Sequence, residues 1–246
     1  EMVADLIDTE GITSVRERFD RAGIRPACFG LPVDWRTPYY DEDEAVRKAR
    51  RAAKAAAAIE CRRCGTWVLP GDDDRNADQY GEFLISRLGP IAEVLHDQGI
   101  GLGLEFVGPR TLRSQFRFPG PYTLKAMLRT AGALGPGNGL LLDIFHLFTS
   151  GGTLEDLRGV DPSRILLVHL NDARSGRSMD EQVDHERDLP GATGLLDLRG
   201  FLGVLREMGY DGPVIAEPFL DSLKELPDDE TRVTRVGESI ANALAI

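Results

Sequence analysis

Short apolar runs that do not alternate with polar residues are the feature that most restricts the fold of this chain. Six such runs occur, four strong ones at residues 66–69, 101–107, 140–145 and 165–170 and two weaker ones at 26–31 and 213–217. The lack of alternation favours strands that are buried on both faces, as in a parallel sheet covered by helices. Helical patterns lie between the runs, at residues 41–58, 76–97, 122–134 and 198–208. The sequence therefore predicts an α/β fold made of repeated strand–helix units.

Polar residues near the carboxyl ends of these runs favour a closed barrel over an open doubly wound sheet. Glu105, Asp143, His169 and Glu217 each lie near the end of an apolar run. In a (β/α)8 TIM barrel the carboxyl ends of all the strands meet on one face, and that face carries the active site. No polar linker or low-complexity stretch divides the chain. We therefore predict one TIM barrel domain that spans residues 1–246.

The number of strands is smaller than a complete barrel needs. Six runs are present, whereas the barrel has eight strands. Residues 1–22 read as helix or loop, and the chain begins with Glu1 rather than Met. We expect that the first strand and most of the second, roughly 30–40 residues at barrel spacing, are missing from this chain. A six-stranded variant of the barrel is the alternative.

Composition and charge exclude several classes of protein. Hydrophobic residues make up 42% of the chain, which is enough to bury a sizeable core. Acidic residues outnumber basic ones by 40 to 29, giving a net charge of -11, and this sign argues against a nucleic-acid partner. The apolar runs are far too short to span a membrane, no signal-peptide pattern is seen, and 3 Cys residues do not make a disulfide framework. We expect a cytoplasmic protein that binds neither nucleic acid nor membrane.

The four polar residues at the strand ends form a candidate metal site. A charged side chain within an apolar run is costly unless it is paired or bound to a metal ion. Two Glu, one Asp and one His make a mixed oxygen and nitrogen set that suits Mn²⁺, Co²⁺, Mg²⁺, Zn²⁺ or Fe²⁺. The alternative is four unrelated buried polar residues, each satisfied by local hydrogen bonds. Because all four occupy equivalent positions, we favour one divalent metal ion held by Glu105, Asp143, His169 and Glu217.

His146 follows Asp143 by three residues, just past the same run. It has three possible roles: a ligand of a second metal, a contact to a substrate hydroxyl, or a surface histidine that caps the next loop. We favour the substrate contact.

Several motifs together resemble a known family. EFVGP at 105–109, LDIFH at 142–146 and VHLND at 168–172 look like the metal-site motifs of the xylose isomerase-like TIM barrels, the sugar phosphate isomerase and epimerase family. RDLPG at 187–191 and GPVIAEPF at 212–219 extend the match. The resemblance covers about residues 24–225 and is greatest to members that isomerise 2-keto-myo-inositol. These motifs are specific for the superfamily but do not fix the substrate.

The resemblance implies a role for each site residue. Glu105, Asp143, His169 and Glu217 would be the metal ligands, and Glu105 and Glu217 would also be the catalytic acid/base pair. His146 would contact the substrate, and Arg187 would bind a substrate oxygen, although Arg187 is otherwise read as a surface arginine paired with Asp184 or Asp188. Asn171 and Asp172 would support His169 and the loop that follows it. The small-molecule substrate would be a sugar or cyclitol, and the protein would be a homo-oligomer, a dimer or a tetramer.

The implied reaction begins with removal of a proton next to a carbonyl group. A divalent ion stabilises the enediolate that results, while positioned carboxylates take and return the proton. Isomerisation, epimerisation and loss of a β-hydroxyl as in a dehydratase share this first step, so the sequence does not separate them. A barrel that keeps its metal but serves as a non-catalytic accessory subunit would have lost an acid/base residue, and both glutamates are present.

A DNA-repair endonuclease of the same superfamily, which uses three zinc ions, is a weaker alternative. That enzyme needs further His residues on early strands, and residues 28–33 and 66–70 contain none. The Cys61 and Cys64 pair lacks the other ligands that a structural zinc needs, so we interpret both as ordinary thiols. For Trp35, Tyr39, Tyr40, Trp67 and Phe106, an aromatic wall of the substrate site and the ordinary core are equally good interpretations.

Overall fold

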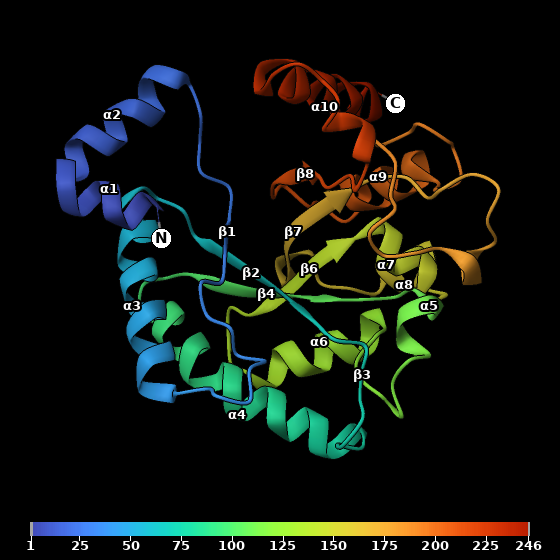
Figure 1. Cartoon of the computed structure of the whole chain (residues 1–246), viewed down its shortest axis with the longest axis horizontal. Helices are drawn as coiled ribbons and strands as arrows, with labels where there is room; N and C mark the ends of the chain where they lie inside the picture. Colours follow the sequence, from blue (N-terminus) through green and yellow to red (C-terminus); the bar gives the residue numbers. More distant parts are fainter. Residues whose placement is uncertain (1, 246) are drawn as a thin grey trace.

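The computed structural model describes residues 2–245, in which strands and helices alternate along most of the chain (Figure 1). The strands are β1 (Phe29–Gly30), β2 (Arg63–Val68), β3 (Gly71–Asp72), β4 (Gly101–Phe106), β5 (Phe118–Pro119), β6 (Gly139–Asp143), β7 (Ile165–Leu170) and β8 (Val214–Ala216). The helices are α1 (Met2–Glu10), α2 (Ile12–Ala22), α3 (Glu42–Ala58), α4 (Ala77–His96), α5 (Arg110–Arg113), α6 (Leu124–Ala133), α7 (Ile144–Thr149), α8 (Leu154–Arg158), α9 (Leu198–Glu207) and α10 (Asp229–Leu244), with 3₁₀ turns η1 (Pro162–Arg164), η2 (Met179–Glu181) and η3 (Asp221–Leu223).

The main sheet is parallel and six-stranded, in the order β1-β2-β4-β6-β7-β8. Neighbours in the sheet follow each other along the chain, apart from the small antiparallel pair β3 and β5, which lies outside it. This order is that of a barrel wall rather than of a doubly wound sheet, in which the strand order reverses. The predicted α/β barrel architecture and its six strands are therefore confirmed.

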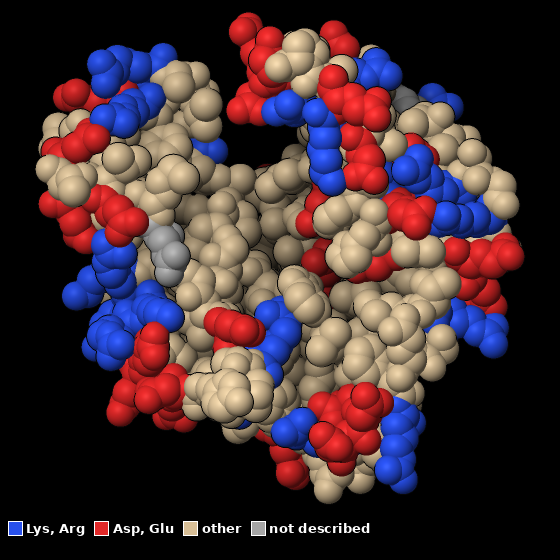
Figure 2. All heavy atoms as spheres, viewed as in Figure 1, with Lys and Arg blue, Asp and Glu red and all other residues tan. Residues whose placement is uncertain are grey.

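The wall is incompletely closed. Within residues 2–245 the edge strands β1 and β8 each pair with one neighbour only, and they do not pair with each other. Figure 1 shows α1 and α2 on one side of the resulting opening and α10 on the other, and Figure 2 shows the same opening as a notch in the surface. Both edge strands are shorter than the apolar runs that predicted them, 26–31 and 213–217, since each has a partner on one side only.

Helix caps explain where the helices begin. The Asp41 carboxylate accepts a hydrogen bond from the Glu44 amide at the start of α3, and Asn76 with Gln79 forms a reciprocal capping box at the start of α4. After α9, which Asp197 caps, Gly209 adopts a φ of 77°, a left-handed conformation that glycine tolerates. These positions agree with the predicted helices to within one or two residues.

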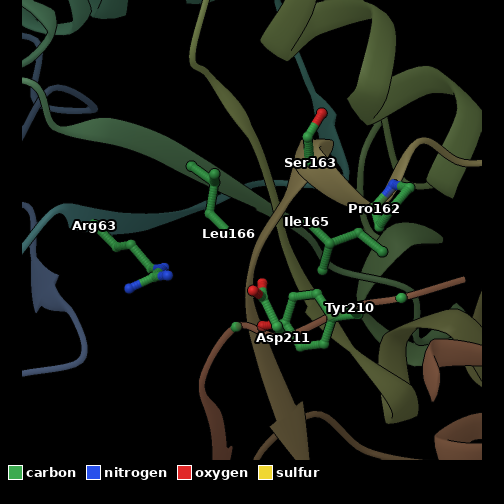
Figure 3. Close-up of a pocket in the computed structure, with 9 residues that line it drawn as sticks. Arg63, Pro162, Ser163, Ile165, Leu166, Tyr210 and Asp211 are labelled. Carbon is green, nitrogen blue, oxygen red and sulfur yellow. The ribbon is translucent and has the colours of Figure 1, made fainter.

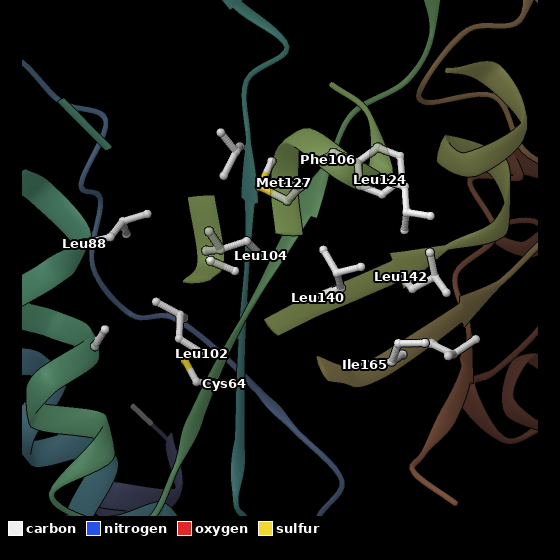
Figure 4. Packing of buried hydrophobic residues seen from close by; sticks show 14 of the residues in the cluster. Cys64, Leu88, Leu102, Leu104, Phe106, Leu124, Met127, Leu140, Leu142 and Ile165 are labelled. Carbon is white, nitrogen blue, oxygen red and sulfur yellow. The ribbon is translucent and has the colours of Figure 1, made fainter. Parts of the chain in front are cut away.

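The hydrophobic core lies between the outer face of the sheet and the helices. In β4, the side chains of Leu102, Leu104 and Phe106 are fully buried on that face, where Leu88 of α4 and Met127 of α6 also lie (Figure 4). The alternate residues Gly103 and Glu105 belong to the opposite, inner face of the wall, and the Glu105 side chain points there. No helix among residues 2–245 is long and apolar enough to cross a membrane. On the face seen in Figure 2, acidic and basic side chains are intermixed.

Candidate metal centre

The four predicted ligands come together at the carboxyl ends of four strands. Glu105 lies in β4, Asp143 ends β6, His169 lies in β7 and Glu217 directly follows β8. One ligand atom from each residue lies within 4.8 Å of the others. Strand register explains part of this arrangement, because Asp143 is the direct pairing partner of His169.

His169 lies at the centre of the group. Its Nδ1 atom is 3.2 Å from Oε2 of Glu217, 3.4 Å from Oε1 of Glu105 and 3.9 Å from Oδ2 of Asp143. Asp143 is fully buried and Glu105 nearly so, whereas the Glu217 side chain is 31% exposed. The cluster is therefore open toward solvent on the side of Glu217.

Two buried atoms of this cluster have no hydrogen-bond partner among the described residues. They are Oε1 of Glu105 and Nδ1 of His169. Burial raises the pKa of Glu105 to about 7. For His169, burial disfavours the charged form, but Glu105 and Glu217 outweigh it and raise the pKa to about 10. Unpaired polar atoms in such a place are costly, and a divalent cation bound to all four side chains would remove this cost. The donor set therefore fits a divalent metal ion.

Neighbouring polar groups fix the orientation of Asp143. Its Oδ1 atom caps α7 by accepting from the amides of Phe145 and His146, at 2.6 and 3.4 Å. The Asn171 amide donates to Oδ2 at 2.9 Å and to Oδ1 at 3.2 Å. Asn171 therefore supports Asp143, not His169 as the resemblance implied.

Asp172 holds the long segment between β7 and α9. Its Oδ1 atom accepts from the amides of Ala173 and Leu196, and its Oδ2 atom accepts from those of Thr193 and Gly194. The carboxylate thereby ties the two ends of residues 173–196 together, as expected for a residue that supports the loop.

Arg187 lies on this segment and is 2% exposed. Its Nη1 atom donates to Oδ2 of Asp143 and to Oε2 of Glu217, both at 2.8 Å. Its Nη2 atom donates to Oδ1 of Asp184 at 2.6 Å, and Nε donates to the Asp184 carbonyl at 2.8 Å. The expected pairing with Asp184 is present, but Arg187 is buried against the predicted ligands Asp143 and Glu217 and is not a surface arginine. Asp188 pairs with Arg174 instead.

His146 is buried beside Arg187, with 1% of its surface exposed. Its Nδ1 atom faces the Gly108 amide at 3.2 Å, and its Nε2 atom faces Nη2 of Arg187 at 3.1 Å. A neutral imidazole accepts at one nitrogen only, so one of these two contacts is a hydrogen bond. Burial and the nearby positive charge of Arg187 lower the pKa of His146 well below its usual value. The ring is therefore neutral and enclosed by protein groups.

The aromatic residues divide into core and surface. Trp35 and Phe106 are buried, Tyr40 is half-buried with its ring against Arg87, and Tyr39 is exposed. Trp67 is 44% exposed and is the direct pairing partner of Glu105, so both side chains face the inside of the wall. Of the aromatic candidates, Trp67 alone combines exposure with a position beside a predicted ligand.

A separate cavity lies at the opposite end of the strands (Figure 3). It has a volume of about 330 Å³, and its lining includes Arg63 at the start of β2, Ile165 at the start of β7, and Tyr210. The amino ends of barrel strands serve stability rather than catalysis. The thiols near this end are ordinary ones, because burial raises the pKa of Cys28, Cys61 and Cys64.

Comparison with known proteins identifies the family. The family model for the xylose isomerase-like TIM barrel matches residues 3–241. A solved structure of a xylose isomerase domain protein from Alicyclobacillus acidocaldarius superposes with a TM-score of 0.82 at 30% identity, over 97% of this chain and 84% of that chain. This chain therefore belongs to the xylose isomerase-like TIM barrel family.

Two curated relatives are enzymes. Inosose isomerase of Halalkalibacterium halodurans is 29% identical over 148 residues, which are 59% of this chain and 49% of that protein. A 3-dehydroshikimate dehydratase of Pseudomonas putida is 34% identical over 94 residues, which are 37% of this chain and 14% of that protein. The matched regions thus span at most about half of the length of these relatives.

Proposed function

We propose that this chain is a divalent-metal-dependent isomerase or epimerase of a sugar or cyclitol. The observation that carries the proposal is the convergence of Glu105, Asp143, His169 and Glu217 within 4.8 Å, with two buried atoms of the cluster unpartnered. Similarity to inosose isomerase supports a cyclitol-derived ketone as the first substrate class to test. Mn²⁺ is the first ion to test, and the proposal includes a cytoplasmic location and a homodimer or homotetramer.

Glu105 and Glu217 are suited to move a proton between two positions of a substrate. A divalent ion held by the four ligands would polarise the substrate carbonyl and stabilise the negative charge that develops on its oxygen. Glu217 is the more exposed carboxylate, and although burial opposes ionisation, His169 and Arg187 lower its pKa. It is therefore ionised and accessible, as a base that removes the proton next to the carbonyl must be.

Glu105 has the properties of a proton donor. Burial raises its pKa above that of an ordinary glutamate, so Glu105 holds a proton more readily than Glu217 does. The two glutamates contact Nδ1 of the same histidine, from β4 and from the end of β8. Return of the proton to the former carbonyl carbon by the same carboxylate gives isomerisation, and return to the original carbon by the second carboxylate from the opposite face gives epimerisation.

A dehydratase is the second candidate function. It is favoured by the 34% identity over 94 residues to 3-dehydroshikimate dehydratase. The first proton transfer is the same, but a β-hydroxyl group then leaves as water. The product distinguishes this reaction from the two others, because the substrate loses the elements of water.

Solvent exchange tests the proposal. Metal-loaded protein is incubated in D₂O with a panel of inososes and ketoses, and loss of the C–H signal next to the carbonyl is followed by NMR. We expect exchange that requires metal, that falls about 10²–10⁴-fold in Glu217→Gln, and that is unchanged in the control Glu207→Gln, whose side chain is exposed on α9. Tight metal binding without exchange on any member of the panel would argue for the non-catalytic accessory barrel.

A further inference from the structure

The guanidinium of Arg187 is almost completely engaged by the protein itself. Four of its five N–H groups donate to oxygens of Asp143, Asp184 and Glu217. The fifth faces Nε2 of His146 at 3.1 Å. A residue that binds a substrate oxygen must present a free donor to the substrate. In this structure Arg187 has no donor directed away from the protein.

The oxygens that Arg187 bonds are those that face the centre of the candidate metal site. Oε2 of Glu217 and Oδ2 of Asp143 each lie 2.8 Å from Nη1 of Arg187. The same two oxygens face Nδ1 of His169, at 3.2 and 3.9 Å. Oε2 of Glu217 keeps a second lone pair, so the N–H group of Arg187 can orient this oxygen while a cation binds it. Oδ2 of Asp143 is oriented by two N–H groups, one from Arg187 and one from the Asn171 amide. Both bonds come from the two hydrogens of Nη1, and the planar guanidinium fixes their directions and hence the separation of the two oxygens.

Charge balance points to the same role. Glu105, Asp143 and Glu217 bring three negative charges into a buried site, and a divalent cation neutralises two of them. The guanidinium charge of Arg187 supplies the third positive charge, at hydrogen-bond distance from two of the three carboxylates. Asp184, which pairs with the same guanidinium at 2.6 Å, adds a fourth negative charge. With Arg187 the loaded site therefore keeps one negative charge, whereas without Arg187 it would keep two, which is more costly in a buried place.

Arg187 also holds the last ligand in place. Strand β8 has 3 residues and pairs only with β7 within the described chain, yet Glu217 directly follows it. The Arg187 amide donates to the Phe219 carbonyl at 3.2 Å, and its guanidinium packs 4.8 Å from the Phe219 ring centre. Through these contacts and its bond to Glu217, Arg187 fastens residues 217–219 to the remainder of the site.

We propose that Arg187 is a positioning residue of the metal site, which fixes the oxygens of Asp143 and Glu217 and balances their charge, and that it does not bind the substrate. The inference rests on the proposed metal centre. It differs from the role that the family resemblance implied for Arg187. It predicts that loss of the guanidinium fork weakens metal binding before any substrate is present.

Metal affinity without substrate is the measurement that tests this role. Mn²⁺, Co²⁺ and Zn²⁺ binding is measured by competition with a chromophoric chelator for the wild type, Arg187→Met and Arg187→Lys. We expect about 10–100-fold weaker binding for Arg187→Met, as for other partners of metal ligands. Arg187→Lys keeps the charge, but its side chain ends one bond short of the Nη1 atom that bonds both oxygens, so we expect an intermediate loss. The matched control is Arg174→Met, which removes a bond to Asp188 on the same segment and leaves the metal ligands untouched.

The outcomes separate this inference from the proposed function. If the wild type binds none of the three ions, the metal centre itself is wrong. If the wild type binds metal, and the Arg187 variants bind it with equal affinity while the KM for the exchanging substrate rises, Arg187 is a substrate contact and the inference is overturned. Circular dichroism reports whether each variant is folded. If Arg187→Met does not fold, the affinity of Arg187→Lys decides, because a substrate contact would leave it equal to that of the wild type.

Discussion

At the scale of single residues, Asp172 supports the candidate site from outside it, by holding the segment that carries Arg187. Its two oxygens accept four backbone N–H groups, from residues 173, 193, 194 and 196. In Asp172→Asn, an amide NH₂ would face two of these donors in a buried place. We expect the free energy of unfolding to fall by about 2–6 kcal/mol, given about 1–3 kcal/mol for each of the two buried donors left unpaired. Urea denaturation measures this change.

The control for that prediction is Asp180→Asn, in the same segment. Asp180 pairs with Arg110, and both side chains are largely exposed. Exposed ion pairs contribute roughly 0–1 kcal/mol, so we expect little change in stability. Equal effects of the two substitutions would show that the carboxylate of Asp172 does not hold the segment. Because this segment carries Arg187, Asp172→Asn should also weaken metal binding.

The three cysteines provide a second prediction at this scale. Burial raises the pKa of Cys28 to about 12 and raises the pKa of Cys61 and Cys64 as well. Since the thiolate is the reactive form, we expect none of the three to react with a disulfide reagent such as DTNB at pH 8 in the folded protein. All three should react in 6 M guanidinium chloride. Rapid reaction of the native protein would contradict the interpretation of the Cys61 and Cys64 pair as unreactive thiols.

At the scale of elements, the sequence predicted the strands and helices that have a local pattern of apolar residues. The runs at 101–107 and 165–170 became β4 and β7 almost without change, and the helical patterns at 41–58 and 198–208 became α3 and α9 to within one residue. The sequence did not predict β3 and β5, because a pair of two-residue strands has no periodicity to detect.

The four candidate metal ligands could be grouped from the sequence for the same reason, since each lies near the end of a recognisable strand. The contacts of Arg187 were not. They join residues 30 to 44 positions apart through a segment with little regular structure. No local pattern specifies which side chains such a segment brings together. The nearest signal was Asp184, three residues before Arg187, which identified one of its partners correctly.

Close contact between strand β6 and its neighbour supports a prediction at this scale. A Cβ atom on Gly139, the first residue of β6, would lie 2.1 Å from the carbonyl oxygen of Arg164. Neither backbone can move without disturbing the pairing of β6 with β7, so Gly139→Ala should destabilise the fold by more than about 3 kcal/mol, at the upper end for overpacked sites.

The control is Gly203→Ala in α9, where no atom lies within 4 Å of the added methyl group. That variant should be more stable by about 0.5–1 kcal/mol. Urea denaturation compares the two, and a larger loss for Gly203→Ala would contradict the argument.

At the scale of the whole molecule, the wall of the barrel and the candidate metal site form one structure. The ligands come from four neighbouring strands of a single sheet, and the core between the sheet and the helices is continuous from Val33 to Leu205. The prediction of one domain follows from this continuity and is tested by unfolding, because a single domain gives one cooperative transition.

Metal binding connects the site to the stability of the whole chain. An ion that binds the folded state alone stabilises it by about 2.7 kcal/mol when its free concentration is 100 times Kd. For a domain of this size, about 2–4 °C per kcal/mol gives an expected rise in Tm of roughly 5–10 °C on addition of metal to chelator-treated protein. Calorimetry should show the entire unfolding transition moving to higher temperature, since the candidate ligands belong to strands that share one core.

Glu105→Gln and Glu217→Gln should reduce the shift in Tm, because each removes a charged ligand, whereas Glu207→Gln should not. Two transitions, of which metal moves only one, would instead divide the chain into a metal-binding unit and a second unit that folds independently.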